Sequence, residues 1–414
     1  MQQPNDFHLG IFFLDALRYS DIDKNNTPFL EQTMRDGIGG PLETLLAYEG
    51  IAATIFTGTY PTQHGIWTRY YRNLKNSPFK WVHPVSPLLE KVDGPLTSTR
   101  AKLVRYAVMR LSTLLAGVSY FPGLDEVPMR ELSQLDFSIR KKLFEPHCFG
   151  SIPSLFDILL ANRLSYRYVD HDLFDTDDTV CQKVLGQNFT ENVTLVRLVD
   201  LDTTSHRYGL GSFERNKIVR HTDALVEKIV TSWRAKHPNL AVACFADHGM
   251  VKAEKFVDIQ TILRSSDLVA FRDYDEFLDS TVARFWGQDA VIEKIKEKLS
   301  GRTEGRVLSN QERAAYHIPA SSRWGQLIFL ANPGYVISPN FFEKNSQVKA
   351  MHGYDPATPG LETFLIANGP MISPQASKTN KLRMVDVFPT ILDMLDLPIP
   401  QYCPGQSLLG NAHS

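Results

Sequence analysis

Aspartate and histidine side chains recur at the ends of short apolar runs in this sequence. Six of them are candidate metal ligands: Asp15, Asp202, His206, Asp247, His248 and His352. Carboxylate oxygens and imidazole nitrogens, with no thiolate among them, suit zinc or manganese. Six ligands make two sites of three, and two metal ions about 4 Å apart can clamp the attacking and leaving oxygens of a phosphoryl displacement. Any one of these residues alone is more often a helix cap or a turn former, so the prediction rests on the whole set.

The apolar runs predict a mostly parallel sheet that positions these ligands. They span residues 8–16, 193–202, 240–249 and 363–370. Continuous apolar runs of this length are typical of strands buried on both faces. Amphipathic helical patterns lie between them, at 150–163 and 212–237. Strands that alternate with helices predict an α/β fold, an α/β/α sandwich around the sheet, with the acidic residues gathered at the carboxyl ends of the strands.

Two segments break this pattern and are predicted to be caps over the site. Residues 70 to about 148 hold proline-rich loops and one basic amphipathic helix. Residues 270–338 indicate a small α+β subdomain, with a strand STVARFWG, a helix AVIEKIKEKLSG and a strand WGQLIFLANPG. The metal-binding core is then formed by residues 1–269 and 339–414.

The basic helix of the first cap spans residues 98–117. Its cationic side chains, beside a broad apolar face, are Arg100, Lys102, Arg105 and Arg110. A helix of this kind can lie on a membrane surface. Packing on the core is the commoner arrangement for an amphipathic helix, and it is the one that we expect.

The composition argues against several classes of protein. The 414 residues carry 44 basic and 46 acidic side chains, which gives no bulk attraction to nucleic acid. No apolar run approaches the length of a membrane span, and the N-terminal run follows no basic segment, so it indicates a strand and not a signal peptide. The four cysteines form no CxxC pair. We therefore expect reduced cysteines, a cytoplasmic protein and a small-molecule substrate, while the sequence does not indicate an oligomeric state.

The order of the motifs resembles the alkaline phosphatase superfamily, and within it the type I phosphodiesterase/nucleotide pyrophosphatase branch. The matching segments are FFLDALR, TGTYPTQHGI, DLDTTSHRYG, FADHGM, MHGYDP and VDVFPTILDMLDLPIP, followed by GQSLLG. They span nearly the whole chain and are sparsest over the two predicted caps. The resemblance implies an α/β/α sandwich that holds two divalent metal ions, usually zinc. It divides the ligands into Asp15, Asp247 and His248 for one ion and Asp202, His206 and His352 for the other, with Asp200 outside the direct ligands.

Two substrate-contacting positions depart from the family pattern. The Thr or Ser nucleophile of the family lies nine residues before the Thr of the TG pair, and counting back from Thr57 gives Tyr48. The phosphate-binding Asn of the family lies five residues after the His of HGI, and counting from His64 gives Arg69. A guanidinium offers two parallel donors to a phosphate or sulfate, so Arg69 is predicted to bind the substrate. The alternative for Arg69 is a solvated surface residue.

Tyr48 is the predicted catalytic nucleophile, with its phenol oxygen on the ion held by the Asp15 group. A phenol has a pKa of about 10, and a bound dication lowers it further. The phenol oxygen, however, lies much further from its backbone than a Thr hydroxyl does. Three alternatives therefore stand beside it: Thr44 as the nucleophile, Glu49 as the base for an attacking water, and an inactive site.

These features predict divalent-metal-dependent hydrolysis of phosphate esters, with phosphodiesters or nucleotide pyrophosphates as the first expectation. A phosphomonoesterase, a phosphotransferase or a sulfatase on the same scaffold are the alternatives among enzymes. A sulfatase fits least, because Tyr48 is neither the Cys nor the Ser that formylglycine chemistry needs. A catalytically silent, metal-stabilised binding protein is the alternative outside enzymes. The sequence contains neither a P-loop motif nor a dinucleotide-binding glycine motif after a strand.

Overall fold

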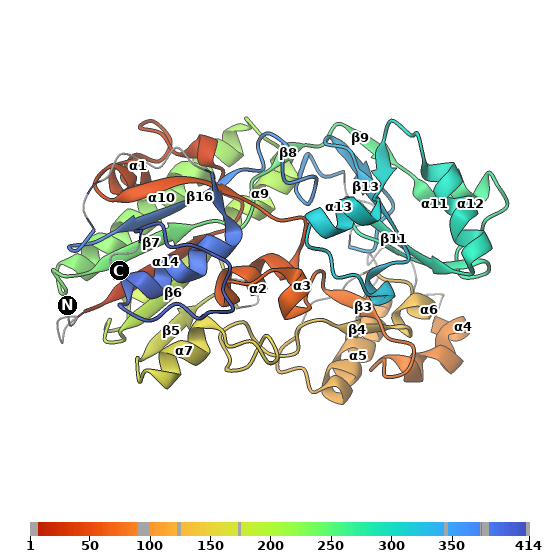
Figure 1. The fold of residues 1–414 in the computed structure, drawn as a ribbon, viewed down its shortest axis with the longest axis horizontal. Coiled ribbons are helices and arrows are strands. Elements are labelled where there is room, and N and C mark those ends of the chain that lie inside the picture. Colours follow the sequence, from red (N-terminus) through yellow and green to blue (C-terminus); the bar gives the residue numbers. More distant parts are fainter. Residues whose placement is uncertain are drawn as a thin grey trace.

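A seven-stranded sheet in the order β17-β2-β16-β7-β1-β6-β5 lies at the centre of one lobe (Figure 1). Its strands are β1 (Leu9–Leu14), β2 (Ile38–Glu43), β5 (Tyr166–Val169), β6 (Val193–Leu198), β7 (Ala241–Phe245), β16 (Thr363–Asn368) and β17 (Leu382–Arg383). β16 runs antiparallel to β2 and β7, and the other pairings of this sheet are parallel. The structure is a computed structural model, and it describes residues 7–89, 99–121, 126–172, 175–342, 347–372, 374 and 381–410.

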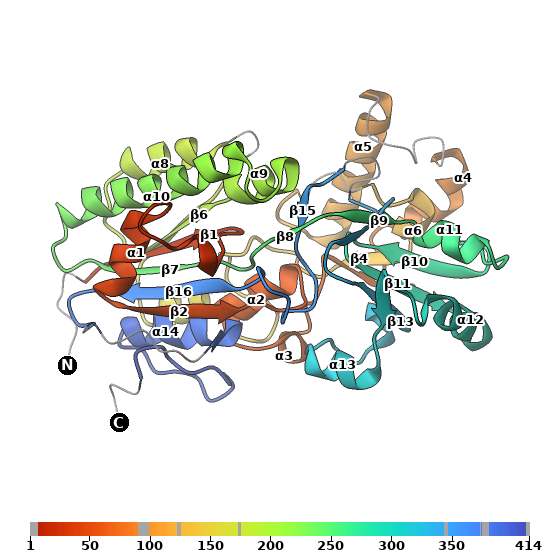
Figure 2. The same cartoon turned by 90° about the horizontal axis from the view of Figure 1, so that it is seen from above.

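Alternate residues of the central strands enter two separate cores. Leu9 and Phe13 of β1 pack into one core, and Phe12 and Leu14 pack into the other, because successive strand residues point to opposite faces. The first core is covered by α2 (Glu49–Thr57), α7 (Leu155–Ala161) and α14 (Val387–Met394). The second core is covered by α1 (Pro28–Arg35), α8 (Asp177–Leu185) and α10 (Phe213–Arg234). Figure 2 shows α8 and α10 on one side of the sheet and α2 and α14 on the other, so the predicted α/β/α sandwich is confirmed.

A second, four-stranded sheet lies in the segment predicted to be a small subdomain. Its strand order is β10-β11-β13-β12, and its pairings are antiparallel. The elements of this segment are β10 (Tyr274–Leu278), β11 (Val282–Gly287), α12 (Asp289–Leu299), β12 (Gly305–Val307), α13 (Asn310–Ala315), η4 (Ser322–Trp324) and β13 (Leu327–Ala331). The sequence predicted β11, α12 and β13 but missed the other strands. Arg284 joins this sheet to the preceding segment, since its Nη1 atom donates a 2.9 Å hydrogen bond to the carbonyl oxygen of Tyr70.

The segment from residue 70 to 148 forms a layer of helices beside the second sheet. It contains β3 (Tyr70–Arg72), η2 (Lys80–Val85), α4 (Ser86–Leu89), α5 (Thr99–Ala116), α6 (Met129–Leu132) and β4 (Leu135–Phe137). α5 confirms the predicted basic helix from residue 99 onward, whereas residues 90–98 and 122–125 lie outside the described part. Val108 and Met109 of α5 share a core with Phe277 and Phe285 of the second sheet. The role of either segment as a cap stays a prediction.

Shorter elements complete the described part of the chain. They are η1 (Tyr19–Asp21), α3 (Pro61–His64), α9 (Asp200–Tyr208), β8 (Val251–Lys252), β9 (Lys255–Val257), α11 (Ile259–Arg264), β14 (Tyr335–Ile337), β15 (Ala350–Met351) and η5 (Met384–Asp386). Among the described helices, none combines the length and the apolar character that crossing a membrane requires.

Candidate active site

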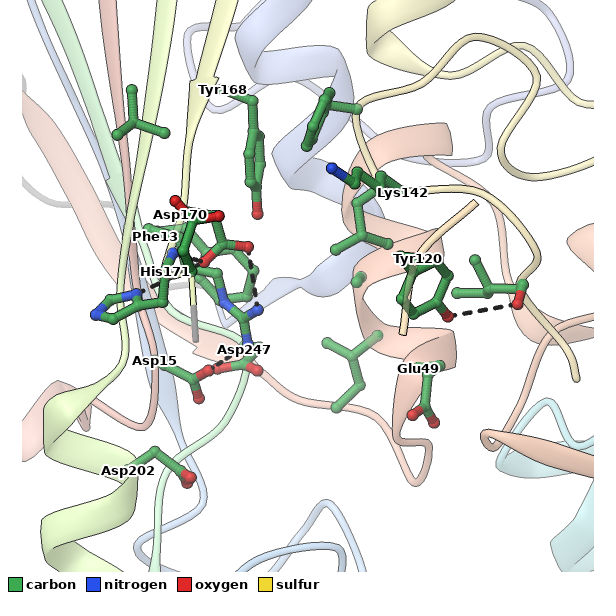
Figure 3. A pocket seen from close by; sticks show the side chains of 18 of the residues that line it. Phe13, Asp15, Glu49, Tyr120, Lys142, Tyr168, Asp170, His171, Asp202 and Asp247 are labelled. Carbon is green, nitrogen blue, oxygen red and sulfur yellow. Dashed lines mark hydrogen bonds and ion pairs between the residues drawn. The ribbon is translucent and has the colours of Figure 1, made fainter. Parts of the chain in front are cut away.

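The carboxyl ends of three neighbouring strands meet at one edge of the large sheet, and three carboxylates lie there. Asp15 follows β1, and Asp247 lies just beyond β7. Asp202 lies in the first turn of α9, which begins just after β6. Figure 3 shows the three carboxylates on the same side of a cavity. The parallel pairing of β1 with both β6 and β7 therefore brings together residues that are far apart in the sequence.

Asp15, Asp247 and His248 form a first group of possible metal ligands. One ligand atom of each lies within 4.8 Å of the other two. The Nε2 atom of His248 is 3.5 Å from a carboxylate oxygen of Asp15 and 3.5 Å from one of Asp247. Its Nδ1 atom lies 3.1 Å from the carbonyl oxygen of Gly249. A proton on Nδ1 that is donated to this carbonyl leaves the Nε2 lone pair facing the two carboxylates.

A second group contains Asp202, His248 and His352, whose ligand atoms also lie within 4.8 Å of one another. His206 lies beside this group, with its Nε2 atom 3.3 Å from a carboxylate oxygen of Asp202. The Nδ1 atom of His206 is 2.9 Å from the carbonyl oxygen of Ala350. The rings of His248 and His352 stack with their centroids 3.6 Å apart. The six predicted ligands thus lie in one cluster, while their division between two ions stays a prediction.

The protonation states of His352 and Asp202 fit divalent cations. Within the described residues, neither Oδ1 of Asp202 nor Nδ1 of His352 has a hydrogen-bond partner, although both atoms are buried. Burial, and next the charge of His248, lower the pKa of His352 well below its ordinary value, so its ring is neutral. For Asp202, burial acts to raise the pKa, but the nearby imidazole of His206 outweighs it and lowers the pKa. Neutral imidazoles and ionised carboxylates are the forms that bind metal ions.

The stability of the metal-free protein should fall as the pH rises from about 4 to about 7. Burial, and next the charge of Asp247, raise the pKa of Asp15 to about 7, against about 3.9 in an unfolded chain. Between these values the folded protein holds a proton that the unfolded chain has lost, so rising pH favours unfolding. We expect the Tm of chelator-treated protein to be lower at pH about 7.5 than at about 5.5. Asp15→Asn should lose most of this difference, and a Tm that rises with pH in the metal-free wild type would contradict the prediction.

The ligand cluster forms one wall of a cavity of about 1050 Å³. Glu49, the first residue of α2, lies across the cavity from the cluster (Figure 3). Six basic side chains also line it: Arg69, Lys141, Lys142, Arg167, Lys183 and Arg197. Apart from the cluster itself, the acidic lining residues are Glu49, Asp170 and Asp172. Once metal ions offset the charge of the cluster, the remaining lining is positive, which suits an anionic substrate.

Arg197 is a candidate site residue that the sequence prediction missed. It lies in β6 opposite Phe13 of β1, and its Nη2 atom donates a 2.7 Å hydrogen bond to Asp15. Its Nη1 atom is 3.6 Å from a carboxylate oxygen of Asp170, which follows β5. The signal was present in the run VTLVRLV, because a charged side chain inside a buried strand requires an anionic partner.

Tyr48 lines the cavity, but its phenol oxygen is held by Thr281, in the turn between β10 and β11. The hydroxyl of Thr281 donates a 2.7 Å hydrogen bond to the carbonyl oxygen of Gly353. The 2.8 Å contact between Tyr48 and Thr281 is therefore donated by the phenol. Burial, and next the charge of Asp279, raise the pKa of Tyr48 far above its ordinary value. We expected the phenol to contact the ion at Asp15, but it contacts Thr281 instead, because the long side chain carries its oxygen to the turn between β10 and β11. The nucleophile role stays a prediction.

Arg69 and Glu49 form an ion pair on the cavity wall. The Nε atom of Arg69 donates a 2.9 Å hydrogen bond to Oε1 of Glu49, and the guanidinium lies 5.5 Å from the ring centroid of Phe342. The other carboxylate oxygen, Oε2 of Glu49, is buried and has no hydrogen-bond partner in the part of the chain that the structure describes. Glu49 lines the cavity, so its carboxylate lies beside the space that a substrate would occupy. The substrate-binding role of Arg69 stays a prediction.

Thr44, the alternative nucleophile, is buried and directs its hydroxyl elsewhere. It lies just after β2 and donates a 2.7 Å hydrogen bond to the carbonyl oxygen of Asp247. The hydroxyl therefore supports the backbone of a ligand residue.

A third group, His171 with Asp177 and Asp200, also has ligand spacing. Burial acts to lower the pKa of His171, but hydrogen bonds with Asp170 and Asp177 outweigh it and raise this pKa to about 9. In the metal-free protein this group is therefore an ion pair, with Nε2 of His171 3.0 Å from a carboxylate oxygen of Asp177. Asp200 also accepts a 3.0 Å hydrogen bond from the backbone N–H of Asp177.

Comparison with known proteins identifies the class to which this fold and cluster belong. The family model described as type I phosphodiesterase / nucleotide pyrophosphatase matches residues 10–355. The chain therefore belongs to the type I phosphodiesterase / nucleotide pyrophosphatase family, which confirms the resemblance seen in the sequence.

Two curated relatives match parts of the chain. It is 26% identical over 212 residues to bis(5'-adenosyl)-triphosphatase ENPP4 of Bos taurus. This match covers 47% of this chain and 42% of that protein. It is 26% identical over 197 residues to ectonucleotide pyrophosphatase/phosphodiesterase family member 7 of Homo sapiens. This match covers 44% of this chain and 41% of that protein. Each match therefore spans less than half of the relative's length.

Solved structures of similar shape cover nearly the whole chain. Human ectonucleotide pyrophosphatase/phosphodiesterase 5 (ENPP5) matches with a TM-score of 0.69 at 13% identity and covers 97% of both chains. An inactive variant of murine ENPP5 in complex with AMP matches with a TM-score of 0.67 at 14% identity and covers 95% of this chain and 96% of that one. At such low identity the likeness shows the fold alone.

Proposed function

We propose that this protein is a divalent-metal-dependent hydrolase of phosphate esters and that phosphodiesters or nucleotide pyrophosphates are its substrates. The observation that carries the proposal is the cluster of aspartate and histidine ligands on the wall of a basic cavity. Membership of the type I phosphodiesterase / nucleotide pyrophosphatase family supports it. The names of the relatives, a bis(5'-adenosyl)-triphosphatase and a nucleotide pyrophosphatase/phosphodiesterase, point to the same bond types.

Two divalent ions would bind at the cluster, with zinc as the first choice and manganese as the alternative. Nitrogen and oxygen donors without thiolate suit both metals. Bound there, the ions would withdraw charge from the phosphoryl oxygens and stabilise the leaving oxygen. Asp15, Asp247 and His248 would hold one ion, and Asp202, His206 and His352 would hold the other. His248 also has ligand spacing to Asp202 and His352, so the two sites would be neighbours.

The facing wall would bind and orient the substrate. Arg69 would bind a phosphoryl oxygen of the substrate through its guanidinium group, which lies on the cavity wall. Arg197 would keep Asp15 in place through its 2.7 Å hydrogen bond. The carboxylate of Glu49, which lines the cavity, would accept the proton of the attacking water. The rival to this arrangement is covalent catalysis by Tyr48.

Substitution of Arg69 should weaken transition-state binding without removing metal. Arg69→Ala should lower kcat/KM about 5-fold to 150-fold, because it removes charged hydrogen bonds to the substrate. This corresponds to a loss of about 1–3 kcal/mol of transition-state stabilisation. Arg69→Lys should recover only part of this loss, because an ammonium lacks the planar fork. Arg72→Ala is the matched control, since Arg72 pairs with Asp275 outside this cavity. Unchanged kinetics in both Arg69 variants would show that Arg69 does not bind the substrate and is only a solvated residue.

A panel of chromogenic esters tests the function itself. A phosphodiester, a phosphomonoester and a sulfate ester should be offered to protein loaded with zinc or manganese, before and after chelation. Turnover of the diester above the other two, lost on chelation, is the expected result. Faster monoester or sulfate turnover would favour the alternative esterases. Transfer of the phosphoryl group to an added alcohol would favour a phosphotransferase, and bound metal without any turnover would favour a silent binding protein.

A cytoplasmic location remains our proposal, with no nucleic-acid partner. The four cysteines are free, and Cys148, Cys181 and Cys244 are buried. Burial raises the pKa of the Cys148 thiol to about 12, which makes this thiol unreactive. Free, unreactive thiols are compatible with a reducing compartment.

A further inference from the structure

We propose that α5 docks on the surface of an anionic lipid membrane. The helix packs Val108 and Met109 into the core that it shares with the second sheet. Its opposite face carries large apolar side chains that remain exposed: Leu103, Tyr106, Leu111, Leu114 and Leu115. Leu114 is 70% exposed and Leu103 is 63% exposed. Figure 2 shows α5 standing out from the body of the protein.

The exposed face of α5 is basic as well as apolar. Arg100, Lys102 and Arg110 are exposed, and residues 99–121 contain no aspartate or glutamate. Arg105 is buried instead, and it donates a 2.7 Å hydrogen bond to the carbonyl oxygen of Val127. Each basic side chain near an anionic membrane strengthens binding by about fivefold. Apolar insertion and charge attraction therefore act together on this face.

The arrangement of the side chains favours a lipid surface over a second copy of the chain or a protein groove. Two α5 faces in contact would bring like charges together, with no acidic residue on either. A groove on a partner protein binds one narrow row of helix side chains. On α5, by contrast, Tyr106, Leu114 and Leu115 spread over about half of the helix circumference. Arg100 and Arg110 lie within this arc. Their long aliphatic stems allow them to lie among apolar groups while the charges reach phosphate head groups.

The docking face continues into the cavity described above. Tyr106 is exposed on α5 and also lines the cavity. Its ring centroid lies 5.2 Å from that of Phe121, which lines the cavity too. The guanidinium of Arg110 lies 6.0 Å from the ring centroid of Phe121. Docking through α5 would therefore hold the part of the cavity that Tyr106 and Phe121 line close to the lipid head groups, whether or not the protein hydrolyses phosphate esters.

Vesicle flotation of the full chain tests the docking surface. The wild-type protein should bind vesicles of phosphatidylcholine mixed with phosphatidylserine, bind them less as salt is added, and bind pure phosphatidylcholine weakly. Two double variants, Arg100→Glu with Lys102→Glu and Leu103→Ser with Leu114→Ser, should each lower binding at least about tenfold. Both should keep the wild-type Tm and the wild-type turnover of a soluble chromogenic diester.

Matched substitutions on other exposed helices are the controls. Lys294→Glu with Lys298→Glu changes the same charge on α12, and Leu160→Ser with Phe213→Ser removes exposed apolar groups from α7 and α10. These variants should bind vesicles as the wild type does. Failure of the wild type to bind anionic vesicles overturns the proposal. The exposed face of α5 would then be assigned to an acidic groove on a partner protein. Equal loss in the controls, retained binding in the α5 variants, or a dimer that the α5 variants dissociate would each overturn it too.

Discussion

Asp247→Asn should lower the turnover of phosphate esters by about a thousandfold and lose one of two bound metal ions. The substitution removes a charged ligand from the group that Asp247 forms with Asp15 and His248. A metal ion contributes several kcal/mol to a phosphoryl-transfer transition state, and about 4 kcal/mol corresponds to about a thousandfold in rate. His352→Ala should have a similar effect, because it removes a ligand from the second group.

Metal analysis combined with kinetics checks this expectation. Each variant should be purified, loaded with zinc, and measured for metal content per chain and for kcat. Asp258→Asn is a suitable control, since Asp258 is an exposed aspartate that accepts a 2.9 Å hydrogen bond from the backbone N–H of Thr261 at the start of α11. It should keep its metal and its turnover. Wild-type turnover in Asp247→Asn, or full activity after chelation, would contradict the two-metal site.

The ligand cluster could be predicted from sequence because the geometry of a parallel sheet places it. Asp15 and Asp247 each lie at the carboxyl end of an apolar run, and parallel strands bring such ends to one edge. The first turn of the following helix then adds Asp202. These placements follow once the direction of each strand and the pairing of β1 with β6 and β7 are given.

The direction of Tyr48 could not be predicted in the same way, because residues far away in the sequence decide it. Thr281, in the turn between β10 and β11, accepts the hydrogen bond of the phenol. Gly353 leaves room for it, since a Cβ atom built there would lie 2.7 Å from the phenol oxygen. Nothing near residue 48 in the sequence carries this information. Arg197 was missed for another reason, since its role depends on Asp15 of the neighbouring strand.

The strands missed in the second sheet show a limit set by their length and composition. β12 has three residues, and it lies at the edge of the sheet beside β13. β10 reads YDEFL, in which two acidic residues interrupt the apolar pattern. Its Glu276 is buried, and burial raises the pKa of this carboxyl to about 7. A strand with a buried carboxyl does not show the alternation from which strands are predicted.

The last prediction concerns the group that starts the reaction. Glu49→Gln should lower kcat by about a hundredfold or more while both metal ions stay bound, because a general base contributes about 10²–10⁴-fold. The amide keeps an oxygen that can accept the 2.9 Å hydrogen bond from Arg69 but loses the basicity of the carboxylate. The variant therefore separates proton transfer from the positioning of Arg69. A change in KM alone would assign Glu49 to positioning.

Tyr48→Phe and Thr44→Val are the comparisons that decide between water and a covalent nucleophile. Each hydroxyl is directed to a structural acceptor, Tyr48 to Thr281 and Thr44 to the carbonyl oxygen of Asp247. Tyr48→Phe should therefore cost about 1 kcal/mol of stability and keep turnover within about tenfold of the wild type, well inside the loss expected for a missing base. Loss of turnover in Tyr48→Phe alone, with both metals retained and a phosphate adduct trapped on residue 48 of the wild type, would instead require the phenol to leave Thr281. The side chain of Tyr48 would then have to turn away from Thr281 during catalysis, by its own rotation or by a movement of the turn that precedes β11.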